Sequence, residues 1–167
     1  AQIGPTAGTE NVFYRFSLGD AEMVVVSDAA FPFNPSIFAA NRPEEEVNEF
    51  FENLGLLDGG QYFNTVLNLV MITDDGVTLF DTGNAGRLVP TIDAIGIGTE
   101  SVTSIIGTHF HPDHVNGLSN EGTPNFPNAQ YFFPQPEYDF LQNAADNVSG
   151  NALGKMQPAL DADMVTF

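Results

Sequence analysis

The N-terminal part of the chain shows the alternation of a half-buried β-strand. Every second residue from Val12 to Leu18 is apolar, residues 19–20 have turn chemistry, and a continuous apolar run follows over 23–26. This pattern predicts a β-hairpin. The preceding residues 1–11 are small and polar, and we expect them to form a flexible arm.

A helix is predicted next, with a polar start and an apolar stripe. Asn41 stands at its start, Pro43 lies in its first turn, and Glu44 follows three residues after Asn41, in capping-box position. Gly55 is the expected stop. Residues at positions i, i+3, i+4 and i+7 form the stripe: Val47, Phe50, Phe51 and Leu54. Packing against the rest of the protein explains such a stripe by itself.

The remainder alternates between strand and helix patterns, which predicts a mixed α/β (α+β) class. Strands are expected over 62–72, 77–80, 102–106, 130–133 and 164–167, and helices over 88–95, 115–118 and 137–143. The last strand is a short apolar run at the chain's end, which favours a polypeptide that once continued. We take residues 12–167 as the N-terminal portion of one domain.

Composition narrows the classes of partner. The chain has 167 residues, 43% of them hydrophobic, and 22 acidic against 4 basic residues, for a formal net charge of −18. Such a surface repels nucleic-acid phosphates and anionic lipids, so we expect neither nucleic acid nor membrane as a partner. The acidity itself is best explained as serving solubility, with attraction of cations to a metal site as a side benefit.

The chain has no Cys, and it begins at Ala1 without an initiator Met. A start of this kind is typical of a mature end left by signal-peptide cleavage, which predicts a periplasmic or secreted protein. An arbitrary boundary explains the same observation and leaves a cytoplasmic location open.

All three histidines of the chain lie within six residues, which scattered core histidines would not do. The string is Thr108-His109-Phe110-His111-Pro112-Asp113-His114, directly after the predicted strand 102–106. Neutral imidazoles with a carboxylate are typical ligands of zinc and similar divalent ions. The alternative for a lone His-x-His is a polar loop, and for Asp-His at a helix start it is capping.

The spacing of these residues predicts two half-sites. Pro112 keeps His111 out of the helical region, and an extended backbone places His109 and His111 on one side. Pro112 also suits the first position of a helix, which puts Asp113 and His114 in its first turn. The dipole of that helix favours a carboxylate there.

The string resembles the His-x-His-x-Asp-His signature of the metallo-β-lactamase superfamily. Asp81-Thr82-Gly83 is similar to the superfamily's Asp-Thr-Gly element, and the segment 126–137 resembles its lactonase-like and phosphotriesterase-like branches. The resemblance implies an αββα sandwich made of two similar halves. It implies that Asp81 braces the metal loop, and that Phe50 or Phe51 could line a substrate pocket.

The resemblance also implies two metal ions, with His109 and His111 on the first and Asp113 and His114 on the second. In the superfamily, later His residues and a bridging Asp complete both shells. No His follows position 114 here. We therefore expect only the first half of the sandwich, apparently truncated, with its apolar sheet face paired with a C-terminal half chain or another copy of itself.

The resulting functional prediction is a metal-dependent hydrolase of an ester, lactone or organophosphate-like small molecule. Zinc is the expected metal, with iron, manganese and cobalt suited to the same ligands, and Asp113 is the candidate catalytic residue that orients hydroxide or passes a proton. Two alternatives stay open: a non-catalytic metal-binding or assembly module, and an iron-dependent oxidoreductase of the same superfamily.

Overall fold

The computed structural model describes residues 12–143 and 147–167, and the backbone alone over 147–150. The predicted arm over residues 1–11 lies outside the described residues. The chain divides into two compact units, a smaller one over 30–65 and a larger one over 12–29 and 66–167.

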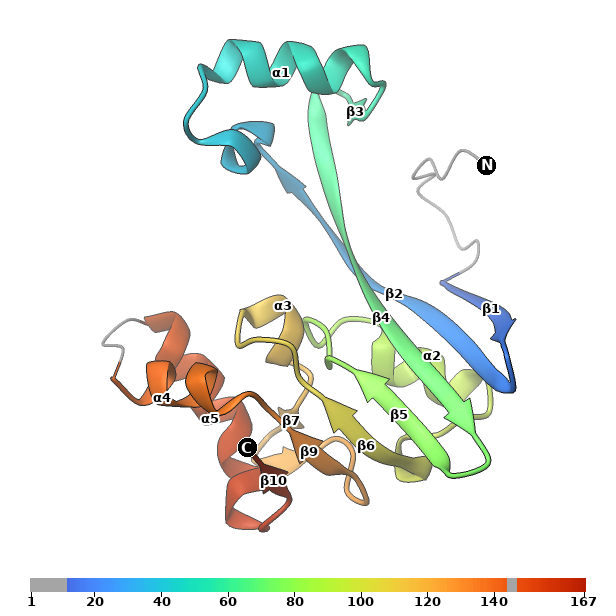
Figure 1. Ribbon diagram of the computed structural model, residues 1–167. Helices are drawn as coiled ribbons and strands as arrows, with labels where there is room; N and C mark the ends of the chain where they lie inside the picture. The colour runs from blue at the N-terminus through green and yellow to red at the C-terminus, as the bar shows by residue number, and fades with distance from the viewer. Residues whose placement is uncertain (1–11, 144–146) are drawn as a thin grey trace. The chain divides into compact units, whose positions relative to one another are not determined.

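The larger unit is built on one sheet with the strand order β1-β2-β4-β5-β6-β9-β10 (Figure 1). Its strands are β1 (Phe13–Leu18), β2 (Ala21–Phe33), β4 (Gln61–Thr73), β5 (Gly76–Phe80), β6 (Val102–Ile106), β9 (Gln130–Phe132) and β10 (Val165–Thr166). The pairs β1/β2 and β4/β5 are antiparallel hairpins, whereas β5, β6, β9 and β10 run parallel. The predicted strands therefore all form, and β2 runs well beyond the predicted 23–26.

One face of this sheet is the core face. The strand register aligns Val70 with Leu79, Leu79 with Ile105, and Ile105 with Tyr131, and all four residues are fully buried. Ile92 of α2 (Leu88–Ala94) and helical residues of α5 (Asn147–Asp161) belong to the same buried cluster. Because side chains alternate along a strand, the residues that flank each of these four in its own strand face the opposite side of the sheet.

The helices of the larger unit follow the predictions in part. α2 and α4 (Gln135–Asn143) form near 88–95 and 137–143. The helix predicted to start at Pro112 and continue over 115–118 forms as α3 (Pro112–Val115) but is shorter than predicted, and the short strands β7 (Ser119–Asn120) and β8 (Thr123–Pro124) follow. A 3-10 turn, η2 (Thr99–Ser101), precedes β6.

α5 was not predicted, because Gly154 and Pro158 break its sequence pattern. Its buried residues nevertheless fall at helical spacing: Ala152 is 1%, Met156 0% and Ala159 2% exposed. Tertiary packing of these three residues outweighs the weak local preference.

The smaller unit contains η1 (Pro35–Ala39), α1 (Glu44–Asn53) and β3 (Leu57–Asp58), which pairs with the start of β4. The predicted capping box at Asn41 is wrong. The helix begins after Pro43 with no side-chain cap, and the Glu44 carboxylate instead accepts a 2.6 Å hydrogen bond from Asn34 Nδ2. Gly55, with φ +66°, ends the helix as predicted.

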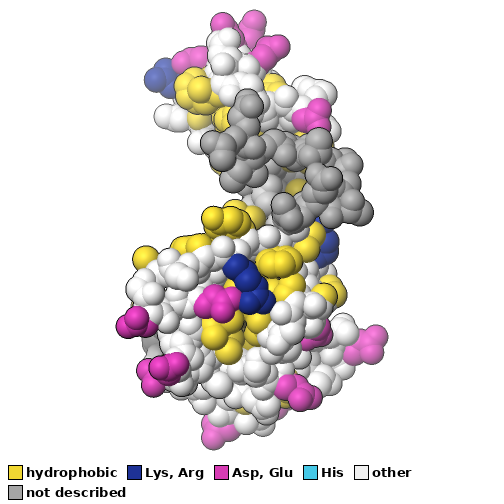
Figure 2. Space-filling model, turned by 90° about the vertical axis from the view of Figure 1, so that its right-hand side faces the viewer, with side chains coloured by type: hydrophobic (Ala, Val, Ile, Leu, Met, Phe, Trp, Pro, Cys, Tyr) yellow, Lys and Arg dark blue, Asp and Glu magenta, His cyan; other side chains and the backbone are white. Residues whose placement is uncertain are grey.

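On the face in view, Figure 2 shows scattered acidic side chains and few basic ones. Among the described residues, no helix combines the length and apolar character that crossing a bilayer requires.

Candidate metal centre

The loop between β6 and α3 carries all three histidines. His111 has the extended backbone expected before a proline, with φ −67° and ψ 150°, and Pro112 begins α3. Asp113 and His114 lie in the first turn of that helix, as their spacing predicted. The local backbone therefore follows directly from the position of one proline.

This backbone brings the three imidazole rings together. The ring centroids of His109 and His111 are 4.6 Å apart, and those of His109 and His114 are 4.0 Å apart. Asp113 Oδ2 lies 3.5 Å from His114 Nε2. Two donors bound at about 2.1 Å to one tetrahedral zinc ion would be about 3.4 Å apart, so the Asp113/His114 pair fits the edge of a coordination shell.

A closed shell is not formed within the described part of the chain. No group of three or more His, Cys, Asp or Glu side chains there is arranged so that it could hold a metal ion. The four predicted ligands are close neighbours, and the donor spacing of the Asp113/His114 pair suits a divalent ion. Their roles as ligands stay a prediction.

Asp81 connects the end of β5 to this loop. Its carboxylate accepts hydrogen bonds from Thr108 N at 2.7 Å, from Thr108 Oγ1 at 2.9 Å and from His114 Nδ1 at 2.7 Å. Its backbone has φ +57°, which is strained for a residue other than Gly. In this conformation one carboxylate contacts both Thr108, in the loop between β6 and α3, and His114, in α3.

These contacts assign the imidazole tautomers. His114 must donate from Nδ1 to the Asp81 carboxylate, which leaves the Nε2 lone pair directed away from Asp81. The Thr108 hydroxyl donates to Asp81, so it accepts from His109 Nδ1, 3.0 Å away. Both rings then expose Nε2, the form in which a neutral imidazole binds a metal.

The electrostatic surroundings shift the pKa values of His109 and His114 in opposite directions. The hydrogen bond that His114 donates to Asp81 raises the pKa of His114, and burial opposes this shift only in part. Burial lowers the pKa of His109, and the neighbouring His114 and His111 lower it further. His109 is thus held in the neutral form more firmly than His114.

Two supports of the loop were missed in the sequence. The His114 carbonyl accepts hydrogen bonds from Thr82 N at 2.8 Å and Thr82 Oγ1 at 3.0 Å, which tie α3 to the segment after β5. Asp28, only 1% exposed, accepts from the backbone N–H groups of Asn84, Gly86 and Leu88. The signal for Asp28 was a lone carboxylate two residues after the predicted strand 23–26, whereas nothing in the sequence singled out its partners.

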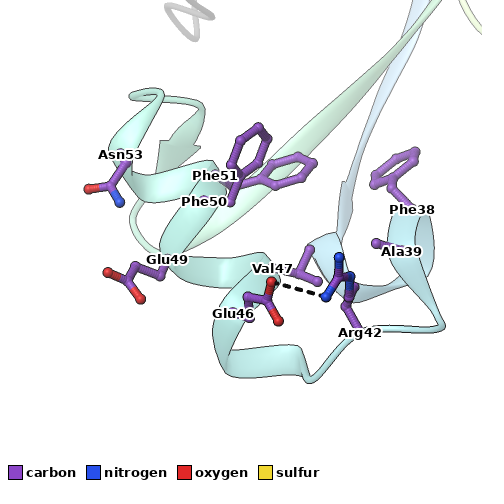
Figure 3. A pocket seen from close by; sticks show the side chains of 9 residues that line it. All are labelled: Phe38, Ala39, Arg42, Glu46, Val47, Glu49, Phe50, Phe51 and Asn53. Atoms are coloured by element: carbon purple, nitrogen blue, oxygen red, sulfur yellow. Dashed lines mark ion pairs between the residues drawn. The ribbon is translucent and has the colours of Figure 1, made fainter.

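Phe50 and Phe51, the predicted pocket-lining residues, do line a cavity of about 500 Å³ in the smaller unit (Figure 3). Phe51 points toward Phe38 of η1, and their rings lie 5.9 Å apart at 18°. The ion pair of Arg42 with Glu46, 3.7 Å, lies at the same cavity. A link between this cavity and substrate stays a prediction.

Comparison with known proteins supports the resemblance found in the sequence. Residues 62–120, which contain both Asp81 and the His cluster, match the sequence model of the metallo-beta-lactamase superfamily. The hydrolase AbOPH of the beta lactamase superfamily superposes with a TM-score of 0.87 at 21% identity, over 95% of this chain and 61% of that one. The fold is therefore that of the metallo-β-lactamases.

Two further solved structures share this metallo-β-lactamase fold. The dizinc quorum-quenching lactonase AidC has a TM-score of 0.81 at 20% identity, over 93% of this chain and 60% of that one. A probable metal-dependent hydrolase from Staphylococcus aureus has a TM-score of 0.73 at 12% identity, over 90% and 60%. A search among curated proteins gave no match. The present chain spans about 60% of the length of these three solved structures.

Proposed function

We propose that this chain supplies the first-half metal ligands of a hydrolase that acts on an ester, a lactone or an organophosphate-like compound. The observation that carries the proposal is the gathering of three imidazoles and the Asp113 carboxylate on one loop at the end of β6. The fold shared with the hydrolase AbOPH and the lactonase AidC supports it.

The donor set consists of nitrogen and carboxylate oxygen, which suits zinc, and also iron, manganese or cobalt. His109 and His111 would hold one ion, and Asp113 and His114 a second. A bound ion lowers the pKa of water to about 7 and polarises a carbonyl or phosphoryl oxygen.

The chain's own residues supply orientation and proton transfer. Asp81 fixes the ring of His114 through Nδ1, so that Nε2 stays available. The Thr108 hydroxyl does the same for His109. Asp113, half-buried beside His114, would orient the attacking water and pass its proton to the leaving group.

We also propose a protein partner, because the second sheet face of the larger unit is apolar and uncovered. The register aligns Phe80 with Ile106, and Ile106 with Phe132. Leu69 is the partner of Phe80 on β4, and Leu67, two residues earlier, faces the same side. Leu67 is 60%, Ile106 39% and Phe132 41% exposed. A C-terminal half chain that packs there would also bring the later His ligands, and self-association is the other outcome.

Zinc titration of the isolated chain tests the ligand assignment. We expect weak or partial binding, because four donors in two pairs leave each shell open, and we expect little turnover of lactones, esters or organophosphates. His109→Ala and Asp113→Ala should each lower the zinc affinity further. Asp139 is an exposed carboxylate on α4, and the control Asp139→Ala should leave the zinc affinity unchanged.

Calorimetry with Zn²⁺ and turnover with and without a chelator are the measurements. Tight binding of two ions by the lone chain would contradict the open-shell prediction. Residual turnover that survives metal removal would reject the metal-dependent mechanism. Metal analysis of protein purified without added metal separates zinc from the iron-dependent oxidoreductase alternative.

A further inference from the structure

The helix that carries Asp113 and His114 is too short to hold its own position. α3 has four residues, Pro112–Val115, and no side-chain cap at its start. Helices of this length are not stable alone in water. Contacts from outside the helix must therefore decide where the two candidate ligands point.

Asn116, the residue that caps the end of α3, makes side-chain hydrogen bonds in two directions. Its Nδ2 donates to Asn84 Oδ1 at 2.8 Å, and its Oδ1 accepts from Asn151 Nδ2 at 2.9 Å. Asn84 lies in the loop after β5, and Asn151 lies on α5, so one side chain joins three segments that are distant in sequence.

This row of amides ends on a buried charge. The backbone N–H of Asn84 donates to Asp28 Oδ2 at 2.7 Å, and Asp28 is 1% exposed. The Asp28 carboxylate also accepts from Leu88 N at 2.7 Å, at the start of α2. A buried carboxylate with several N–H donors is a rigid reference point, because any shift leaves a charge or a donor unpaired.

We propose that Asn116 is a positioning residue for the Asp113/His114 half of the metal centre, and that the row Asp28–Asn84–Asn116–Asn151 sets the rotation of α3. The inference rests on the proposed function only for its consequence in metal binding. Thr82 and Gly83 fix the distance of α3 from the segment after β5, because Thr82 donates to His114 O from both N and Oγ1, and Gly117 N donates to Gly83 O at 3.3 Å. The hydrogen bonds of Asn116 to Asn84 and Asn151 add a restraint on the rotation of α3 about its axis.

The test compares Asn116→Ala and Asn151→Ala with Asn128→Ala in the full chain. Asn128 is a matched control, because its Nδ2 also donates one hydrogen bond, to Glu100 O at 2.8 Å, away from α3. In the metal-free chain, Asn116→Ala should raise amide hydrogen exchange across residues 113–117, with a smaller rise in Asn151→Ala and none there in Asn128→Ala.

The same variants are titrated with Zn²⁺, and with Co²⁺ to record its absorption bands. Asn116→Ala should lower the affinity of the Asp113/His114 half about 10- to 100-fold and change the Co²⁺ spectrum. Asn84→Ala should add little to Asn116→Ala, because both remove the same hydrogen bond. Unchanged exchange over 113–117 in Asn116→Ala would overturn the inference.

The two proposals fail in different ways. Absence of Zn²⁺ and Co²⁺ binding in the unaltered chain would reject the proposed metal centre, while the exchange measurement would still decide whether Asn116 positions α3. Normal metal affinity and an unchanged Co²⁺ spectrum in Asn116→Ala, with the unaltered chain binding metal, would reject the positioning role alone.

Discussion

At the scale of single residues, Asp81 shows how one side chain can serve a whole loop. Its three hydrogen bonds reach Thr108 twice and His114 once, and they fix the imidazole tautomers on which metal binding would depend. The left-handed backbone at Asp81, unusual outside Gly, is the local strain that this arrangement requires.

Replacement of Asp81 by Ala should lower the zinc affinity of the chain about 10- to 100-fold, because His114 loses the acceptor that orients its ring. Calorimetric titration measures this change. Asp75→Ala, in the exposed turn between β4 and β5, is the matched control and should bind zinc as the unaltered chain does. Equal affinities for the two variants would contradict the role of Asp81.

Tyr131 gives a pH-dependent prediction that does not involve the metal centre. Burial raises the pKa of its phenol to about 12, and its hydroxyl donates to Phe126 O at 3.2 Å. The folded state thus holds its proton above the ordinary pKa of about 10. The resulting stabilisation is complete below pH 10 and is lost as the pH rises from about 10 to 12.

Unfolding in urea at pH 8 to 12 measures this loss. Tyr131→Phe removes the ionisable group, so its free energy of unfolding should fall less steeply above pH 10 than that of the unaltered chain. Parallel curves for the two proteins would show that Tyr131 does not contribute.

At the scale of elements, the close approach of the Gly107 backbone to the Phe133 ring fixes where the loop between β6 and α3 leaves β6. A Cβ atom at Gly107 would lie 1.9 Å from Phe133 Cε1, and Phe133 is buried and stacked on Phe110 at 4.8 Å. Gly154, within α5, is exposed and has nothing within 4 Å of such an atom. A side chain would therefore clash at Gly107 but not at Gly154.

Gly107→Ala should lower the free energy of unfolding by about 1–3 kcal/mol, because the methyl group forces Phe133 out of its packed position. Gly154→Ala should raise it by about 0.5–1 kcal/mol, since Ala favours a helix interior. Chemical denaturation of both variants checks the signs. A neutral Gly107→Ala would mean that Phe133 can move freely.

At the scale of the whole molecule, the uncovered sheet face of the larger unit should determine how the chain associates. Leu67, Ile106 and Phe132 lie on that face, and apolar patches of this kind favour association. Light scattering should show the chain as larger than a monomer at micromolar concentration.

Ile106→Lys together with Phe132→Lys should shift the chain toward monomer, because charges would then lie in the buried contact. Phe140→Lys, at a residue on α4 that is 65% exposed, is the control and should leave the association unchanged. A monomer in the unaltered chain would reject association through this face.

The sequence by itself determined the features that depend on neighbouring residues. Apolar alternation and apolar runs specified the strands. Pro112 specified the extended His111 and the start of α3, because a proline restricts the backbone on both of its sides. The string His109–His114 and the element at Asp81 were enough to predict the metallo-β-lactamase fold, which the comparisons confirm.

Only the tertiary structure decided which distant residues support that loop. α5 forms against its local preference because Ala152 and Met156 pack into the core. Asp28 and Asn116 hold the segments around α3 through hydrogen bonds to residues between 32 and 60 positions away. No short-range pattern encodes such partners, since a hydrogen bond between distant segments depends on the fold that brings them together.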